Sequence, residues 1–368
     1  MNKIISFVWN NFDNDDRVKK KSITLSTNNK VVVYCVPKPK DWVVPIKMVN
    51  ENLIVRYIKT KNIIDWVWKR VFINEWFWKK NLNSSDLDVS NGELFIDCND
   101  PDTLSAGVHI LKKYKKGYKL VYDAHEYFKD NFVFYTRPFQ FFNSLICYTS
   151  YKIREKIYIP CVSEVTTVSE GIADLIRKDL EYLIMDKKVT TIPNYCYKNT
   201  NKIDFYKKEK IAVFVGGYVR QGLDDIIKKF IVMNWRVQVI GNIPRKKIEK
   251  VEYVGYLKKV EYMKLLEKAS IGLLYYNVPN KSYKYSCPNK MSDYIQAGCF
   301  VLANKDLKNV CNIIQKYSVG IGLDLQEFEH RLSLVFWINE NSFKQAQENL
   351  SWEKYEKRLL NIYKEVKL

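Results

Sequence analysis

A helix that starts beside a lysine is the first part of this sequence that could do chemistry. Pro288 suits the first turn of a helix expected over 289–297, because the N–H that proline lacks has no partner there. Gly298 suits the end of that helix. The N–H groups and dipole of a helix start attract anions, Lys290 adds charge, and Asp293 can accept hydrogen bonds from sugar hydroxyls. An ordinary capped helix beside a sheet is the alternative.

A histidine with two carboxylates is the second such group. Asp123, His125 and Glu126 directly follow a strand predicted over 119–122. Ligands bind at the carboxyl ends of parallel strands, and a histidine beside carboxylates can contact a substrate or transfer a proton. We favour such a role for His125 over the alternative, in which it only anchors its loop through a hydrogen bond.

Three aspartates follow the first predicted strand, at the same edge of the sheet. Asp13, Asp15 and Asp16 could each act as a base or as a contact to an acceptor. Aspartates also cap helices and complement the positive end of the helix dipole. We expect this second, structural role for two of the three.

A pair of glycines, Gly216-Gly217, ends the strand predicted over 211–215. Glycine lets the backbone approach a diphosphate closely, and Arg220 could pair with the phosphates. The pair lies in the same half of the chain as Lys290, which strengthens its interpretation as a phosphate-binding turn.

Hydrophobic periodicity predicts two α/β halves that position these groups. Strands alternate with helices in each half, and the polar segment 199–210 between them is predicted to be a linker. We expect one domain at 1–198, onto which a helix at 352–368 packs back, and a second domain at 199–351. The predicted strands are 3–8, 31–35, 93–97, 119–122, 164–168 and 189–192, then 211–215, 237–240, 251–254, 271–275 and 300–303.

Composition narrows the partners and the compartment. The 368 residues carry a net charge of +19, which predicts a polyanionic partner: nucleic acid, an anionic membrane surface or phosphorylated substrates. The eight Cys form no C-x-x-C pair and the three His have no metal-ligand spacing, so we expect reduced thiols and no metal. No signal peptide or membrane-spanning run is visible. These features predict a cytoplasmic protein.

Two segments interleave aromatic and basic residues. Four Trp stand among six Lys and Arg in 59–82, and 127–158 has a similar composition. At a membrane interface, rings sit at headgroup level and cations meet anionic lipid. Packing of the Trp onto the core is the alternative, and stacking on nucleic-acid bases is less favoured. We expect a peripheral site on the inner face of the cell membrane and no nucleic-acid partner.

The order of six short stretches resembles the bacterial glycosyltransferases of the GT-B class, near the group 1 or family 4 transferases. The resemblance covers nearly the whole chain. It implies two Rossmann-like domains facing a central cleft, with a C-terminal helix returning to the N-terminal acceptor domain. The stretches are LVYDAHE (Leu120–Glu126), VTTVSEGI (Val165–Ile172), TIPN (Thr191–Asn194), FVGGYVRQGL (Phe214–Leu223), VGYL (Val254–Leu257) and CPNKMSDYIQAGCFV (Cys287–Val301).

The resemblance implies a role for individual residues of this sequence. Asp293 matches the second acid of a paired-acid motif that holds the donor ribose, and His125 lies near the transferred sugar. The remaining matched positions hold the donor: Asn289, Lys290 and Met291 at the diphosphate, Gly217 and Arg220 in the phosphate turn, and Tyr256 and Leu257 at the nucleobase.

Two departures bear on the chemistry. The first acid of the pair falls at Tyr285, which leaves the stereochemistry open, and the usual Lys of the phosphate turn is Gln221. Arg220 or Lys290 could substitute for that Lys. If the reaction inverts, Asp13, Asp16 or His125 could deprotonate the acceptor; if it retains, the leaving phosphate can take the proton.

These matches predict transfer of a sugar from a nucleotide sugar, UDP-linked by preference, to a saccharide or polyprenyl-phosphate-linked acceptor in bacterial surface polysaccharide synthesis. Retention is favoured, and no metal or other cofactor is expected, because fixed N–H groups and cations can stabilise the departing phosphate. Two alternatives remain: a nucleotide-sugar epimerase on the same fold, and a non-catalytic protein that binds polyanions or membranes.

Overall fold

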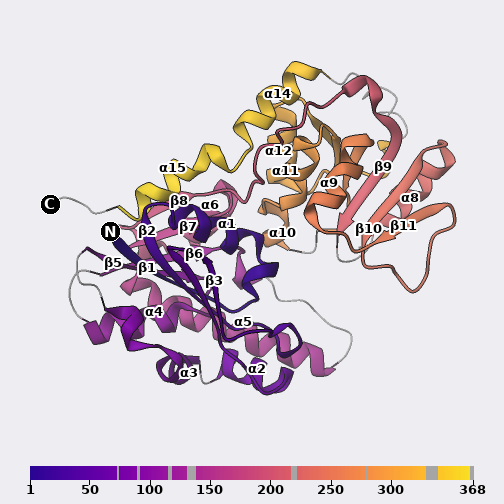
Figure 1. The fold of residues 1–368 in the computed structure, drawn as a ribbon. Coiled ribbons are helices and arrows are strands. Elements are labelled where there is room, and N and C mark those ends of the chain that lie inside the picture. The colour runs from indigo at the N-terminus through magenta and orange to yellow at the C-terminus, as the bar shows by residue number, and fades with distance from the viewer. Residues whose placement is uncertain are drawn as a thin grey trace. The chain divides into compact units, whose positions relative to one another are not determined.

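The computed structural model describes residues 1–72, 74–88, 92–114, 118–130, 138–216, 222–278, 280–328 and 339–364. The chain divides into two compact units (Figure 1). The first unit contains Met1–Ile192 with Glu356–Leu368, and the second contains Pro193–Tyr355. The boundaries expected from the sequence, 198/199 and 351/352, lie a few residues from these.

An eight-stranded sheet forms the centre of the first unit. Its order is β3-β4-β2-β1-β5-β6-β7-β8, and each pair of neighbours is parallel except β3 and β4. The central strands are buried on both faces, as a parallel sheet requires. The strands are β1 (Asn2–Val8), β2 (Asn29–Cys35), β3 (Ile46–Asn50), β4 (Leu53–Tyr57), β5 (Leu94–Asn99), β6 (Tyr118–Ala124), β7 (Glu164–Thr167) and β8 (Lys188–Thr191).

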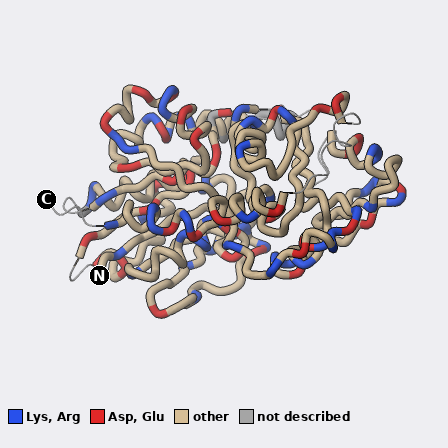
Figure 2. The backbone as a smooth tube through the Cα atoms, turned by 90° about the horizontal axis from the view of Figure 1, so that it is seen from above, with Lys and Arg blue, Asp and Glu red and all other residues tan. Residues whose placement is uncertain are grey.

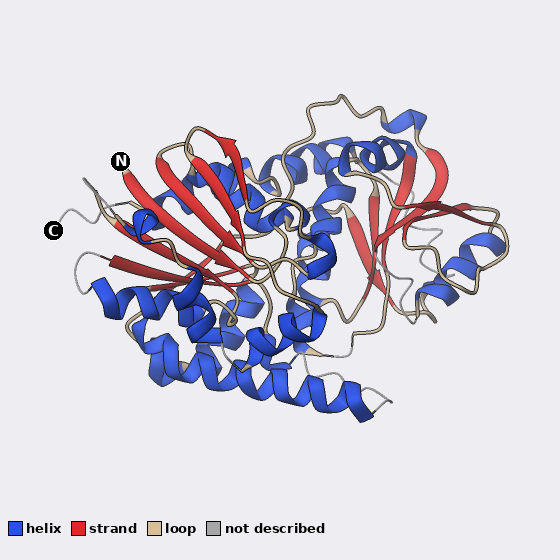
Figure 3. Ribbon diagram, turned by 60° about the horizontal axis from the view of Figure 1, so that its bottom comes forward, coloured by secondary structure: helices blue, strands red, loops and turns tan. Residues whose placement is uncertain are grey.

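Helices cover both faces of this sheet (Figures 1 and 3). One face carries α1 (Asp16–Leu25), α6 (Glu170–Asp179) and the C-terminal α15 (Glu353–Ile362). The other face carries α4 (Leu104–Tyr114) and the long α5 (Pro138–Tyr158), with α2 (Ile63–Val71) and α3 (Asn74–Asn81) packed beside them. The short α7 (Glu181–Ile184) follows α6.

Side-chain caps begin two of these helices where the sequence places them. The Asp15 carboxylate accepts from the Val18 N–H at 3.1 Å and caps α1, and Ser169 caps α6 by accepting from Ile172. Asp16 is the first residue of α1, where a negative charge complements the dipole. The capping role expected among the three aspartates is therefore confirmed for Asp15.

The second unit is a six-stranded, all-parallel sheet in the order β11-β10-β9-β12-β13-β14. A cluster of buried apolar residues fills the space between α8 and the sheet, with Phe230 and Trp235 in edge-to-face contact. On the other face lie α9, α11 and α12 (Figure 1). The elements are β9 (Glu209–Gly216), α8 (Leu223–Val232), β10 (Arg236–Gly241), β11 (Val251–Gly255), α9 (Lys259–Lys268), β12 (Ala269–Leu274), α10 (Lys281–Tyr285), α11 (Asn289–Gln296), β13 (Phe300–Asn304), α12 (Lys308–Lys316), β14 (Gly320–Leu323) and α14 (Glu340–Asn349).

The predicted α/β class and the strands named from the sequence are confirmed, each within a few residues. The sequence interpretation missed the β3–β4 hairpin and β14. In β3 the side chains alternate between half-buried and exposed, so the strand lacks the apolar run that marks the central strands.

The tryptophans of 59–82 divide equally between the core and the surface. Trp66 and Trp78 are buried, with 7% and 0% of their surfaces exposed, and both contact the ring of Trp9. Trp68 and Trp76 are 53% and 58% exposed. The core-packing alternative therefore holds for two of the four, and the other two need another explanation.

Within the described ranges, no helix combines the length and the apolar character needed to cross a bilayer.

The C-terminal segment is fastened to the first unit by a buried phenol. Tyr363 donates from its hydroxyl to Asp97 Oδ1 at 2.7 Å and packs its ring against Phe95. The start of this segment is held by Glu356, which accepts from Thr24 at 2.9 Å. These contacts explain why a helix from the end of the chain packs against the sheet of the first unit.

We expect Tyr363→Phe to destabilise the first unit by about 1.5–3 kcal/mol, because it removes a hydrogen bond to a buried carboxylate. Urea unfolding followed by circular dichroism measures the change. Tyr182→Phe is the matched control, since that ring is 90% exposed. Equal midpoints for the two variants would contradict the assigned role of Tyr363.

Candidate active site

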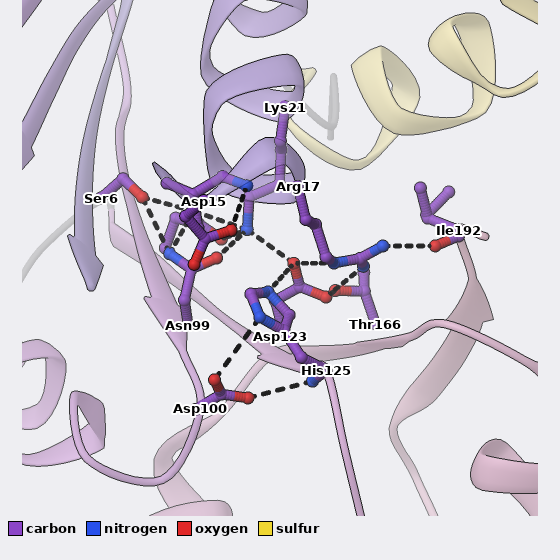
Figure 4. A network of polar contacts seen from close by, with 12 residues as sticks. Ser6, Asp15, Arg17, Lys21, Asn99, Asp100, Asp123, His125, Thr166 and Ile192 are labelled. Atoms are coloured by element: carbon purple, nitrogen blue, oxygen red, sulfur yellow. Dashed lines mark hydrogen bonds and ion pairs between the residues drawn. The ribbon is translucent and has the colours of Figure 1, made fainter. Parts of the chain in front are cut away.

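The first candidate site lies at the carboxyl ends of β5 and β6. Parallel pairing sets Asn99 opposite Asp123, and Asp100 and His125 are the first residues beyond the ends of the two strands (Figure 4). Asp100 has a positive φ of 65°, which turns the chain sharply after β5. The sheet register therefore brings together polar side chains that are about 25 residues apart in sequence.

Asp123 is the centre of this site. Its carboxylate is fully buried and accepts from Arg17 through two nitrogens at 3.1 and 2.6 Å, from Lys21 at 2.7 Å and from Thr166 at 2.7 Å. Burial alone would raise the pKa of Asp123, but Arg17 and Lys21 outweigh it and hold that pKa well below its usual range. Asp123 is therefore a permanent anion and cannot serve as a base at neutral pH.

Lys21 joins a second buried carboxylate to the first. Its ammonium lies 2.9 Å from Asp97 and 2.7 Å from Asp123, and it also donates to Asn99. Asp97 accepts from Ser6 at 2.7 Å. Burial lowers the pKa of Lys21, but the two carboxylates raise it further, so the lysine stays charged. Two buried cations thus face two buried anions.

His125 is held between two carboxylates. Its Nε2 lies 3.1 Å from Asp123 Oδ2, its Nδ1 lies 3.4 Å from Asp100 Oδ2, and its backbone N–H donates to Asp100 Oδ1 at 3.1 Å. Burial lowers the pKa of His125, but Asp100 and Asp123 raise it above the usual value. The ring is 14% exposed, so it can reach a ligand, and in its charged form it donates protons or hydrogen bonds.

The other two predicted catalytic residues lie in different surroundings. Asp13 is bound to Lys47 at 2.5 Å and to the Tyr57 hydroxyl at 2.9 Å. Burial raises the pKa of Asp13, but these two partners lower it overall, which makes it a poor proton acceptor. Asp16 begins α1 and is half-buried. The structure thus groups His125 with Asp100 and Asp123, and it gives Asp13 a separate set of partners.

The second candidate site is the start of α11 in the second unit. Tyr294 fixes this helix to the sheet: its ring lies against Gly272, where an added Cβ would come within 2.2 Å of the ring. The Tyr294 hydroxyl accepts from the Val215 N–H at 2.9 Å. Gly298 follows the helix at φ +71°, as the sequence predicted for its end.

Asp293 organises the charges around α11. Its carboxylate is fully buried, lies 2.8 Å from Lys259 and 3.4 Å from Lys290, and accepts from Tyr262 at 2.8 Å. Burial raises the pKa of Asp293, but Lys259 and Lys290 lower it overall. The Lys290 ammonium also lies 4.3 Å from the centre of the Tyr262 ring. Two partly exposed cations are therefore fixed beside the helix start.

The other predicted donor contacts occupy varied positions. Asn289 is the first residue of α11 and is half-buried, whereas the Met291 side chain is fully buried. Tyr256 is 82% exposed after β11, and Leu257 is half-buried. Gly217 and Arg220, together with Gln221, lie outside the described residues.

The strand ends of the second unit come unusually close at two glycines. An added Cβ at Gly241 would lie 1.8 Å from the carbonyl oxygen of Gly216, and Gly241 has a φ of +137°. Both features require glycine at position 241. The two strands can therefore approach this closely only because position 241 carries no side chain.

Acidic, thiol and imidazole side chains do not gather in threes into a metal-binding group anywhere in the part of the chain that the structure describes. Side chains supply the positive charge described in both sites. These are Arg17 and Lys21 in the first unit, and Lys259 and Lys290 in the second.

Solved structures share this architecture over the whole chain. A sucrose-phosphate synthase from Thermosynechococcus elongatus matches with a TM-score of 0.68 and 12% identity, covering 99% of this chain and 98% of that one. A trehalose-6-phosphate synthase, described for glycosyltransfer with retention, matches at 0.65 and 10%, covering 98% of each chain. Arabidopsis thaliana UGT89C1 complexed with UDP-L-rhamnose matches at 0.57 and 10%, covering 98% of each.

The chain has the GT-B fold. At these identities the likeness is one of fold, and it confirms the fold that the sequence stretches suggested. No protein-family model matches the sequence, and neither does any curated protein.

Sequence interpretation missed four cationic or phenolic members of these two candidate sites: Arg17, Lys21, Lys259 and Tyr262. Arg17 and Lys21 lie in a run of basic residues that resembles a solvated helix face, and nothing local marks them as buried. One signal in the sequence pointed to the proximity of Asp100 and Asp123. Both follow predicted strands that are consecutive in the chain, and the carboxyl ends of parallel strands meet at one edge of a sheet.

We expect the loss of stability in His125→Gln to be largest below pH 6.5 and to shrink as the pH rises through the raised pKa of His125. The sign follows because a raised histidine pKa stabilises the folded state only while the ring is protonated. Urea midpoints across pH measure the difference from the wild type.

His109→Gln provides a control of opposite sign. Burial lowers the pKa of His109, so its replacement should raise relative stability at low pH. A loss in His125→Gln that is independent of pH would show that the ring is neutral between its two carboxylates and would contradict the assignment.

Proposed function

We propose that the protein is a glycosyltransferase that moves a sugar from a nucleotide-sugar donor to a saccharide or lipid-linked acceptor. The observation that carries the proposal is the GT-B fold shared end to end with a sucrose-phosphate synthase, a trehalose-6-phosphate synthase and a UDP-L-rhamnose complex. The polar sites at the sheet edges of both units support it, because ligands of α/β folds bind there.

The second unit is proposed to bind the donor. The diphosphate would lie at the start of α11, near Lys290 and the glycine backbone at the end of β9 and β10. As the sugar–phosphate bond breaks, negative charge grows on the departing phosphate, and a cation already in place stabilises it. Asp293 and Tyr262 keep Lys290 in place.

The finer features of the donor follow from the same parts. We propose a UDP-linked sugar and a reaction without a metal, since Lys290 and Lys259 can supply the positive charge that a metal would otherwise provide. The ribose is proposed to bind near Asp293, with Asn289 and Met291 contributing backbone groups. Gly217 and Arg220 would complete the phosphate turn, and Tyr256 and Leu257 would contact the base.

The first unit is proposed to hold the acceptor. His125 is partly exposed, and Asp100 and Asp123 raise its pKa against the effect of burial, so it suits a contact to the transferred sugar or to an acceptor phosphate. Retention is favoured, since a GT-B neighbour was described for transfer with retention and the leaving phosphate can then take the proton. If the reaction inverts, Asp16 would be the remaining base candidate, because Lys47 and Tyr57 make Asp13 a poor proton acceptor. The proposed setting is bacterial surface polysaccharide synthesis on the cytoplasmic side of the membrane.

Thermal unfolding with a panel of nucleoside diphosphates tests donor binding. One base should stabilise the protein by roughly 2.7 kcal/mol at about 100 times its dissociation constant, with or without EDTA. Lys290→Met should lose most of this shift, whereas Lys344→Met, on an exposed lysine of the same unit, should keep it. Absence of a shift with every nucleotide would contradict the proposal.

Analysis of the reaction products distinguishes the transferase from the two alternatives. Incubation with the stabilising sugar nucleotide should give a new glycoside only when an acceptor is added. An epimerised sugar formed without an acceptor would identify an epimerase instead. Nucleotide binding with neither product, across saccharide and polyprenyl-phosphate acceptors, would favour a non-catalytic binding protein.

A further inference from the structure

The outer side of α2 and α3 exposes large apolar side chains that are not buried in the core. Ile63, Ile64, Trp68, Phe72 and Trp76 each expose more than half of their surfaces to solvent. The rings of Trp68 and Phe72 lie 4.4 Å apart, so they form one exposed apolar pair. The inner side of the same helices already supplies the core through Trp66 and Trp78.

The long helix α5 continues this apolar surface. Leu145, Ile146, Ile153 and Ile157 follow one stripe of the helix and are 39–58% exposed. Together with Phe72 they line a groove of about 630 Å³ between α5 and the α2–α3 pair. The three helices lie side by side on one face of the first unit (Figures 1 and 3). We call this surface the α2–α5 face.

Hydrogen bonds hold the α2–α5 face in one arrangement. Arg154 of α5 donates to the last carbonyls of α2, at 2.5 Å to Arg70 O and 2.8 Å to Val71 O. Arg70 in turn forms an ion pair with Asp102, which also lies 3.5 Å from Arg154. These contacts therefore fix the positions of the helices on either side of the groove.

Exposed lysines lie on the helices of the α2–α5 face and just before α2. Lys61, Lys79, Lys80, Lys152 and Lys156 are all exposed, and the Lys80 ammonium lies over the Trp76 ring. Among the described side chains of α2, α3 and α5, Glu75 is the one exposed carboxylate, since Asp65 is paired with Lys69 and Glu155 is buried. The surface around the apolar stripe is thus strongly cationic.

We propose that the α2–α5 face docks on an anionic lipid bilayer. Apolar side chains with exposed indoles would enter the headgroup–acyl boundary while the surrounding lysines meet anionic headgroups. The positive rim disfavours a second copy of this chain, because like charges would meet. Aliphatic side chains of α5 line one side of the groove, which suits acyl chains better than bases, and polar side chains that include Glu75 and Arg154 line other parts of it. Elsewhere along the described backbone of both units, the positions of Lys and Arg are interspersed with those of Asp and Glu (Figure 2).

Vesicle flotation tests this proposal independently of any transferase activity. The wild-type protein should float with vesicles of phosphatidylcholine and phosphatidylglycerol, and should do so less at high salt and less with phosphatidylcholine alone. Ile64→Ser/Trp68→Ser/Ile157→Ser should lose at least about tenfold in binding to the anionic vesicles. These side chains are exposed, so the circular dichroism spectrum and melting temperature should stay unchanged.

Two further variants sharpen the test. Val232→Ser/Val260→Ser removes exposed apolar side chains from the second unit and should leave binding intact. Lys79→Glu/Lys80→Glu should weaken binding to anionic vesicles and flatten its salt dependence. Brominated lipid should quench tryptophan fluorescence in the wild type and less in Trp68→Phe/Trp76→Phe.

Three outcomes would overturn the proposal. The first is a wild-type protein that ignores anionic vesicles at low salt. The second is a triple variant that binds them as well as the wild type does. The third is self-association in the absence of vesicles that the triple variant abolishes, which would assign the α2–α5 face to a second copy of the chain.

Discussion

The buried ion pairs around Asp123 are the interaction on which the first unit depends. Two carboxylates and two cations are removed from water there, and an unmatched charge in such a place is strongly destabilising. The network tolerates burial because Arg17 and Lys21 meet Asp123 and Asp97 with hydrogen-bonding geometry. Its members come from α1, β5 and β6, so the same contacts that satisfy the charges also fix the helix against the sheet. Burial lowers the pKa of His125, but the neighbouring Asp100 and the Asp123 of this network raise it overall.

The second unit also neutralises a charge that is buried away from water, here a single carboxylate. Asp293 gathers Lys259, Lys290 and Tyr262 and leaves both lysines partly exposed beside the start of α11. An anion that arrives at this helix therefore meets cations whose positions are already set, which is the condition for stabilising a developing charge. The resemblance assigns Asp293 to the ribose, whereas the structure commits its carboxylate to the lysines. Burial raises the pKa of Asp293, but Lys259 and Lys290 lower it overall, which favours the charged form that pairs with them.

The aromatic residues of α2 and α3 serve two purposes that composition cannot separate. Trp66 and Trp78 build the core with Trp9, and the Trp66 indole N–H donates to Val36 O at 3.1 Å. Trp68 and Trp76 remain in solvent next to exposed lysines. Helical geometry sends residues two apart to different sides of the helix, so a single short segment presents both kinds of surface.

The sequence alone determined the α/β class, the central strands of both sheets, the end of α11 at Gly298 and a capping role among the aspartates before α1. These features depend on local periodicity, backbone freedom and short-range hydrogen bonds, which neighbouring residues specify. Only the tertiary structure decided that Arg17 and Lys21 are buried, that His125 lies between Asp100 and Asp123, and which tryptophans are exposed. Those outcomes depend on contacts between residues far apart in the chain, as in the pair Arg17 and Asp123, 106 positions apart. A basic residue in a helix looks the same in sequence whether its partner is water or a carboxylate that the sheet brings to it.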